Sequence, residues 1–141
     1  MNWQFKREEQ QFDAIPEGKY RVRIDGTEMA ESKAGNDMII LKLAVSGQTK
    51  QLWHYIVFLD DRPEITNRNL TAIFDSFGID EGNLNISDWI GSVGACTVKH
   101  DEEGRAKVGY FIRKDKQDTL PPWQGEGAPQ FREIPAEELP F

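Results

Sequence analysis

The sequence predicts an all-β domain with one helix, followed by an acidic tail without regular structure. Three observations lead to this prediction. Five short segments are rich in β-branched and aromatic residues and alternate between apolar and polar positions, as strands do. Turn residues separate these segments. A single helical stripe of apolar residues lies between the third segment and the fourth.

Composition limits the class of protein before any element is considered. With 141 residues, 38% of them hydrophobic and 29% charged, the chain can form one soluble domain with a real core. No apolar run approaches the roughly 20 residues that span a bilayer, and acidic residues stand where a signal peptide would be apolar. The single cysteine, Cys96, allows no internal disulfide. We therefore expect a cytoplasmic protein without a membrane partner.

The charge of the chain is unevenly distributed. Its net value of −7 argues against a uniformly basic surface for nucleic acid. Residues 117–141, however, hold five carboxylates and only one base, Arg132. Over half of the excess negative charge therefore lies in this tail, and any binding face for a polyanion would be a local basic patch.

The first predicted strand spans residues 19–25 and follows an N-terminal arm over 1–14 and a turn at 16–18. Its apolar residues alternate with Lys19, Arg21 and Arg23, which are expected on the outer face. That face is either a charged edge that favours solubility or part of a binding surface. A polar loop over 29–37 leads to the second strand, 38–45.

The third predicted strand, residues 49–58, is apolar on both faces. With a period of two, one face carries Leu52, His54, Ile56 and Phe58, and the other carries Trp53, Tyr55 and Val57. Either the strand is buried on both sides, or one face offers aromatic rings to a ligand. A short turn at 46–48 joins it to the second strand as a hairpin, so the three strands form an antiparallel meander.

One helix is predicted after the acidic break at residues 60–64. Its apolar positions repeat at i, i+3, i+4 and i+7 and are expected in the core: Leu70, Ile73, Phe74 and Phe77. Thr66 or Asn67 is the expected N-terminal cap, and Gly78 the residue that ends the helix.

The fourth and fifth predicted strands, residues 92–100 and 105–114, form a hairpin around a tight turn at 101–104. In the fifth strand, alternation predicts Val108, Tyr110 and Ile112 facing the core and Lys107, Phe111 and Arg113 facing outward. After residue 116 the periodicity stops. The Pro- and Gly-rich composition of 117–141 predicts a disordered acidic tail.

Three strands, a helix and a two-stranded hairpin follow one another in the order of the OB-fold, a five-stranded Greek-key barrel, over residues 15–116. A generic antiparallel sandwich is the competing architecture. The OB-fold binds its ligands on the second and third strands and the flanking loops. The residues expected to contact single-stranded nucleic acid are Trp53, Tyr55, Arg21, Arg23, Lys42, Lys50, Lys107 and Phe111.

The phase of the third strand decides this prediction. Exposed rings at Trp53 and Tyr55 would stack on bases, while nearby lysines and arginines neutralise phosphates. In the alternative phase both rings lie in the core and His54 is exposed. The stacking surface would then move to Phe111 and the basic face of the first strand.

No catalytic constellation is recognisable in the sequence. His54 and His100 are the only histidines, and neither has the spacing of a metal ligand. Cys96 is interpreted as a small core residue, and residues 91–94 lack the Gly-Lys-Ser/Thr of a phosphate loop. We expect neither enzymatic activity nor a cofactor.

The last nine residues read Glu-Ile-Pro-Ala-Glu-Glu-Leu-Pro-Phe and contain no base. This ending resembles the acidic C-terminal tip of bacterial single-stranded DNA-binding proteins, although the acidic run is shorter here. In that family the tip docks replication and repair enzymes, with its Phe in an apolar pocket and its carboxylate held by basic residues. The resemblance implies that role for Glu137, Glu138, Leu139, Pro140 and Phe141.

Four segments of the body carry a second resemblance: residues 15–20, 32–37, 52–55 (Leu-Trp-His-Tyr) and 74–79. They are similar to a family of small phage and prophage proteins of replication and recombination modules that are regarded as single-stranded DNA binders. This resemblance covers about residues 12–114. It implies a non-enzymatic DNA-binding protein of phage replication or recombination, in the host cytoplasm, which recruits replication or recombination enzymes.

An alternative function remains open at this point. The chain could be an OB-like protein–protein adaptor, or a recombination accessory factor without intrinsic DNA binding. A homo-oligomer is compatible with either function.

Overall fold

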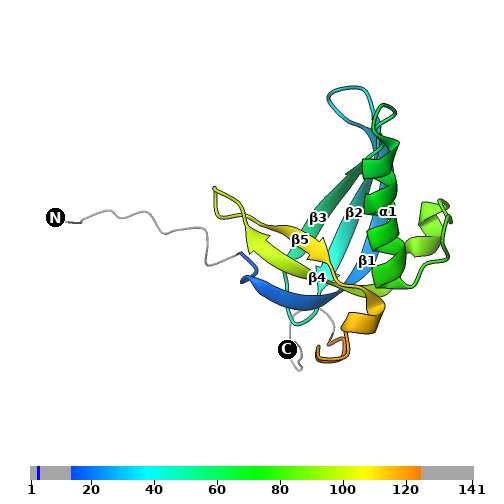
Figure 1. Ribbon diagram of the computed structural model, residues 1–141. Coiled ribbons are helices and arrows are strands. Elements are labelled where there is room, and N and C mark those ends of the chain that lie inside the picture. The colour runs from blue at the N-terminus through cyan, green and yellow to red at the C-terminus, as the bar shows by residue number, and fades with distance from the viewer. Residues whose placement is uncertain (1–2, 4–13, 125–141) are drawn as a thin grey trace.

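The computed structural model describes residue 3 and residues 14–124 of the chain. Five antiparallel strands form a nearly closed barrel, and one helix packs against it (Figure 1). In chain order the elements are β1 (Gly18–Glu31), β2 (Asp37–Val45), β3 (Gln51–Val57), α1 (Pro63–Phe77), β4 (Val93–His100) and β5 (Ala106–Phe111). The prediction of a mostly-β fold with its helix between the third and fourth strands is confirmed, and the arrangement is consistent with an OB-like barrel.

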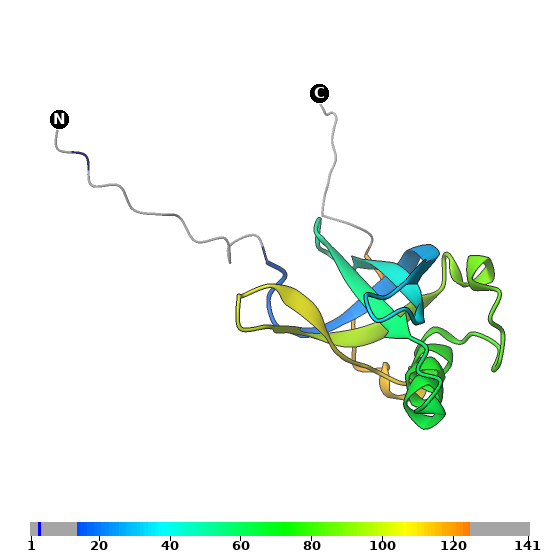
Figure 2. The ribbon, with the colours of Figure 1, turned by 90° about the horizontal axis from the view of Figure 1, so that it is seen from above.

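The strand order of the sheet explains how the barrel curls. Hydrogen-bonded neighbours follow the order β3-β2-β1-β4-β5, with β1 in the centre. Val22 and Arg23 pair with β2 on one side and with β4 on the other. A register shift between Ile24 and Gly26 marks a bulge, which bends β1 between its two partners. Figure 2, with α1 seen nearly end-on, shows the β4–β5 hairpin extending away from the helix.

The two outer strands of this order, β3 and β5, meet through their side chains. The rings of His54 on β3 and Phe111 on β5 lie edge to face, with centroids 5.0 Å apart. Phe111 also packs edge to face on Phe77 of α1, at 5.7 Å. The apolar seam between the two strands is therefore continuous with the core beneath the helix.

The core is filled from all elements of the barrel. The four apolar residues predicted to form the buried stripe of α1 are all buried, which confirms that prediction. The largest fully buried side chain is Trp89, in a short 3₁₀ helix over Ile86–Trp89. Its indole N–H donates to the carbonyl oxygen of Asn83 at 2.9 Å, and its ring lies edge to face on Phe74. The polar segment before β4 therefore closes one side of the core.

The two ends of α1 differ in how well they were predicted. Neither Thr66 nor Asn67 caps the helix, because it begins earlier, at Pro63. The Thr66 hydroxyl instead accepts the Leu59 N–H at 2.8 Å and so ties the helix to the loop after β3. Gly78 ends the helix as predicted, in the left-handed conformation with φ of 69°. Within the described part of the chain, no helix is long and apolar enough to cross a bilayer.

β1 is longer than its sequence pattern indicates. Residues 29–31, predicted as the start of a polar loop, continue the strand and pair with residues 37–39 of β2. Backbone hydrogen bonds hold this end of the ladder. On β1 this end carries the exposed Met29 and Glu31, whereas Ile39 of β2 lies in the core, so these residues of β1 show no apolar alternation.

The prediction for the orientation of the β5 side chains is wrong at two residues. Tyr110, expected in the core, is 60% exposed, whereas Phe111, expected outside, packs against the core. Cys96 pairs with Phe111 and Val98 with Val108, so two residues of β5 lie opposite Thr97 alone. This bulge reverses the phase of the strand after Gly109. The Thr97 hydroxyl accepts the N–H of Tyr110 at 3.0 Å and stabilises the bulge.

Candidate nucleic-acid interface

The outer surface of β2 and β3 carries a pair of exposed aromatic rings. Trp53 and Tyr55 are each 53% exposed, while the alternating residues Leu52 and Ile56 are buried. Of the two phases that the sequence left open, this is the one that the nucleic-acid interpretation requires. We call the surface formed by Trp53, Tyr55 and Lys42 the aromatic face.

Register places a cation beside the tryptophan. Lys42 of β2 lies directly opposite Trp53 on one side and Gly26 of β1 on the other. A Cβ added at Gly26 would lie 3.6 Å from the Cβ of Lys42, so the glycine leaves this flank of the lysine uncovered. Large planar groups can therefore approach Trp53 and Lys42 without meeting a side chain at position 26.

The aromatic face has a charge gradient along the strands. In the row of Tyr55, the partner on β2 is Ile40 and the next on β1 is the exposed Glu28. At the other end, Lys50 is exposed just before β3 begins. Neither Lys42 nor Lys50 forms an ion pair with any described residue. An anion is therefore favoured at the Trp53 end, where Lys42 and Lys50 lie.

Two predicted cationic contacts, Arg21 and Arg23, are already engaged by the chain itself. The Arg21 guanidinium donates to the carbonyl oxygens of Pro121 at 2.6 Å and Gln117 at 3.1 Å. Arg23 pairs with Asp25 at 2.6 Å and lies over the ring of Trp123, 5.0 Å from its centroid. Arg21 thus donates to residues 117–124, which we call the C-terminal strap, and Arg23 contacts the same strap through the ring of Trp123.

The C-terminal strap corrects the predicted start of the disordered tail. Gln117 is 3% exposed, and its side-chain amide donates to the carbonyl oxygens of Ser76 at 3.0 Å and Ile112 at 2.8 Å. At the other end, the N–H of Gln124 donates to the Ser46 hydroxyl at 2.9 Å. The strap therefore runs across the outer face of β1 to the β2–β3 turn. The polar composition of residues 117–124 does not indicate that they pack on the barrel, because the hydrogen bonds of the strap join residues far apart in the chain.

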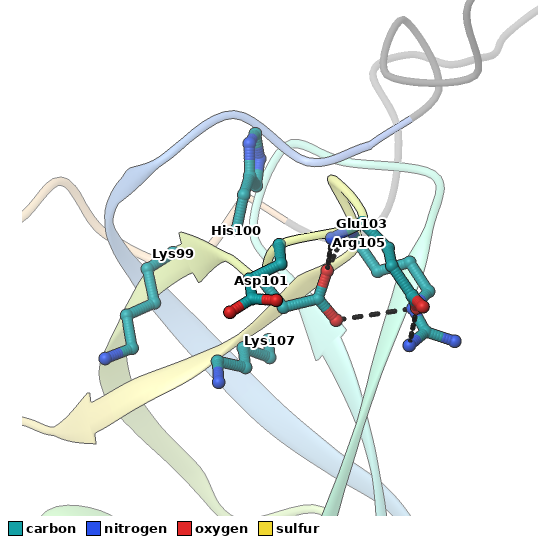
Figure 3. A pocket seen from close by; sticks show the side chains of 7 residues that line it. Lys99, His100, Asp101, Glu103, Arg105 and Lys107 are labelled. Carbon is teal, nitrogen blue, oxygen red and sulfur yellow. Dashed lines mark hydrogen bonds and ion pairs between the residues drawn. The ribbon is translucent and has the colours of Figure 1, made fainter.

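Lys107 lies at a different place, near the tip of the β4–β5 hairpin (Figure 3). It is paired in the ladder with Lys99, and the two side chains extend the same way. The turn beside them is acidic: the backbone N–H of Arg105 donates to Asp101 at 2.9 Å and lowers the pKa of that carboxyl. The open hollow at this tip balances three bases against three carboxylates, so it does not select for anions.

His54 is an uncharged side chain of the barrel seam. It lies on the inward face of β3 against Phe111, and burial lowers its pKa from 6.5 to about 4. The neutral ring fits an apolar seam, whereas a protonated ring would lose its hydration there.

We expect this group to make the fold sensitive to acid. In the unfolded chain His54 binds a proton near pH 6.5, but in the folded chain only near pH 4. Between these values the unfolded state holds more protons, so the free energy of unfolding falls as pH falls, by up to about 1.4 kcal/mol per pH unit. Urea unfolding at a series of pH values should show this loss, and His54→Leu should reduce it. Equal pH dependence in both proteins would contradict this role of His54.

Cys96 is buried on β4, and burial raises the pKa of its thiol to about 12. In residues 14–124, no three His, Cys, Asp or Glu side chains are grouped as a metal would require. The groups that the aromatic face presents, two rings and the Lys42 ammonium, are suited to stacking and to charge contacts.

Family comparison covers the whole barrel. Residues 4–111 match the model of a family described as "Protein of unknown function (DUF669)". The chain belongs to the DUF669 family. No curated protein matches it. The DUF669 match ends at the last residue of β5, so it includes the aromatic face but not the C-terminal strap.

Two sets of residues that carry predictions are not among those that the structure describes. The docking tip, Glu137, Glu138, Leu139, Pro140 and Phe141, lies outside the residues that the structure describes. The same holds for most of the N-terminal arm, of which Trp3 and Ala14 alone are described.

Tyr110 is an exposed ring that sequence reasoning assigned to the core. The signal that could have identified it is Gly109, since a glycine inside a strand often marks a bulge. A Cβ there would overlap the Thr97 hydroxyl oxygen, so the close approach of the two strands requires glycine.

Proposed function

We propose that this chain is a single-stranded DNA-binding protein built on an OB-fold. The observation that carries the proposal is the aromatic face, where Trp53 and Tyr55 are exposed beside Lys42 on β2 and β3. The strand order, and the helix between β3 and β4, support the OB-fold, whose ligands bind on this pair of strands.

Binding would combine stacking with charge. Each exposed ring can stack on one base, a contact worth roughly 1–3 kcal/mol that any base can make. Lys42 and Lys50 lie where phosphates of the same strand would pass and would add a salt-dependent term. Because the face contains few groups that could read base edges, binding would depend little on sequence.

The wider role rests on sequence resemblance. We propose that the protein acts in phage replication or recombination in the host cytoplasm, without enzymatic activity of its own. Its terminal residues, from Glu137 to Phe141, would recruit replication or recombination enzymes, as in the bacterial proteins whose tip they resemble.

A mobility-shift comparison of single-stranded and duplex DNA of equal length, across a salt series, tests the proposal. We expect preferential binding of the single strand that weakens as salt rises. No binding of the single strand at low salt would overturn it. Tail-dependent capture of a replication enzyme by a protein that binds no DNA would favour the adaptor function instead.

A further inference from the structure

A second aromatic and basic surface lies on the opposite side of the C-terminal strap from the aromatic face. It is a hollow of about 280 Å³ between the end of β5 and the start of β1. Its polar and aromatic lining includes Lys19, Tyr110, Arg113, Lys116 and Thr119, and Leu120 of the strap adds an apolar contact. We call it the Tyr110 pocket.

The Tyr110 pocket has a net positive charge. Three cationic side chains line it, and no carboxylate does. Arg113 shares its charge with Asp115 at 3.3 Å, in a pair that is largely exposed and so weak. Lys19 and Lys116 form no ion pair with any described residue. The pocket therefore attracts an anionic group.

The ring of Tyr110 is held outward by the backbone. The bulge at Gly109 turns it away from the core, and the bond from its N–H to the Thr97 hydroxyl stabilises that conformation. The ring is 60% exposed, more than either ring of the aromatic face. An exposed ring among cations has the two elements that single-stranded nucleic acid requires, a stacking surface and phosphate contacts.

Lys19 connects this pocket to the aromatic face. It also lines a neighbouring hollow, of about 330 Å³, together with Ser46, Gly47 and Gln48 of the β2–β3 turn. That turn leads through the exposed Lys50 into β3 and Trp53. The hollows and cations thus form a surface path from Tyr110 along the strap to the aromatic face. The path passes Arg21, which lines the second hollow while its guanidinium donates to the strap.

We propose that the Tyr110 pocket is a second contact site for the same single strand. A base stacks on Tyr110 while phosphates contact Lys19, Lys116 and Arg113, and the strand continues past the β2–β3 turn to Trp53 and Tyr55. This inference rests on the proposed function and extends it, because it predicts a longer binding site than the aromatic face alone provides.

Oligonucleotides of different length distinguish binding at the Tyr110 pocket from binding at the aromatic face. The full-length protein would be titrated with oligo-dT of about 16 and about 4 nucleotides, the ends of the range of site sizes of single OB folds. Tyr110→Ala should lower the affinity for the longer oligonucleotide by about fivefold or more. It should leave unchanged the tryptophan quenching produced by the shorter one, which the aromatic face can hold alone.

Charge variants test the phosphate contacts. Lys19→Gln combined with Lys116→Gln should reduce the salt dependence of binding the longer oligonucleotide, by roughly 0.7 in the logarithmic slope for each phosphate that is no longer neutralised. Arg62→Gln with Arg68→Gln removes the same charge at exposed positions of α1 and its N-terminus, and should leave the slope nearly unchanged.

Photo-crosslinking to oligonucleotides containing bromodeoxyuridine identifies the contacts directly. Crosslinks at Tyr110 as well as at Trp53 or Tyr55 would support the path. Crosslinks at the aromatic face alone, with unchanged affinity and salt slope in the variants, would overturn the proposal of a second contact site but leave the proposed function intact. A protein that binds neither oligonucleotide fails both proposals. Binding of an acidic peptide in the Tyr110 pocket without any Tyr110 crosslink would overturn the inference and assign the pocket to a protein partner.

Discussion

Trp53→Ala is expected to weaken binding of single-stranded DNA by about 5- to 150-fold, because one stacked base contributes roughly 1–3 kcal/mol. The ring is 53% exposed on the outer surface of β3, so its removal leaves the core unchanged. Equilibrium titration with fluorescein-labelled oligo-dT, followed by anisotropy, measures the change without relying on the tryptophan itself.

Leu84→Ala provides the matched control for this variant. Leu84 is 52% exposed in the segment between α1 and β4, so its truncation removes a similar exposed apolar side chain away from the aromatic face. We expect its affinity to match that of the parent protein. Equal affinities for Trp53→Ala and Leu84→Ala would contradict a stacking role for the aromatic face.

Gly94→Ala is expected to destabilise the fold by about 1–3 kcal/mol, the cost of overpacking a filled core. A Cβ at this position of β4 would lie 2.8 Å from the Ser76 hydroxyl oxygen and 2.9 Å from the Phe77 ring. The Ser76 hydroxyl cannot readily move, since it donates to the carbonyl oxygen of Ala95 at 2.9 Å and accepts the Ala95 N–H at 3.1 Å. Urea unfolding followed by circular dichroism should show a lower midpoint at unchanged slope.

Gly26→Ala is the control for this prediction. Its added Cβ would make only an ordinary contact with Lys42, at 3.6 Å, so we expect the free energy of unfolding to stay within about 0.5 kcal/mol of the parent value. Equal unfolding midpoints for the two variants would show that α1 does not pack on β4 as closely as described.

Elements with an uninterrupted period could be predicted from the sequence. The stripe from Leu70 to Phe77 predicted the buried face of α1. The pattern of residues 51–57 predicted a strand, but it is apolar on both faces and left open which face is buried. In α1 the direction of each side chain follows from its place in the helical repeat. Gly78 could be recognised as the end of the helix because it directly follows the last apolar residue of the stripe, where a glycine favours the left-handed conformation.

Prediction from periodicity failed where contact with a segment distant in the chain changes the backbone conformation or occupies a side chain. The bulge opposite Thr97 exchanges the directions of Tyr110 and Phe111, and only the pairing of β4 with β5 produces it. Likewise, Arg21 and Arg23 have the predicted outward direction, but residues 117–124 occupy them. No local pattern indicates that a Pro-rich segment returns across β1.

The sequence by itself determined the element order and the buried face of α1, because these follow from local periodicity. Only the tertiary structure decided that Trp53 and Tyr55 are exposed, and which cations remain available beside these rings. Arg21 is engaged by hydrogen bonds to the strap, and Arg23 by Asp25 and the ring of Trp123. Four lysines form no ion pair within the described residues: Lys42, Lys50, Lys19 and Lys116. Such pairings depend on how strands and loops meet in space, and a one-dimensional pattern does not contain that information.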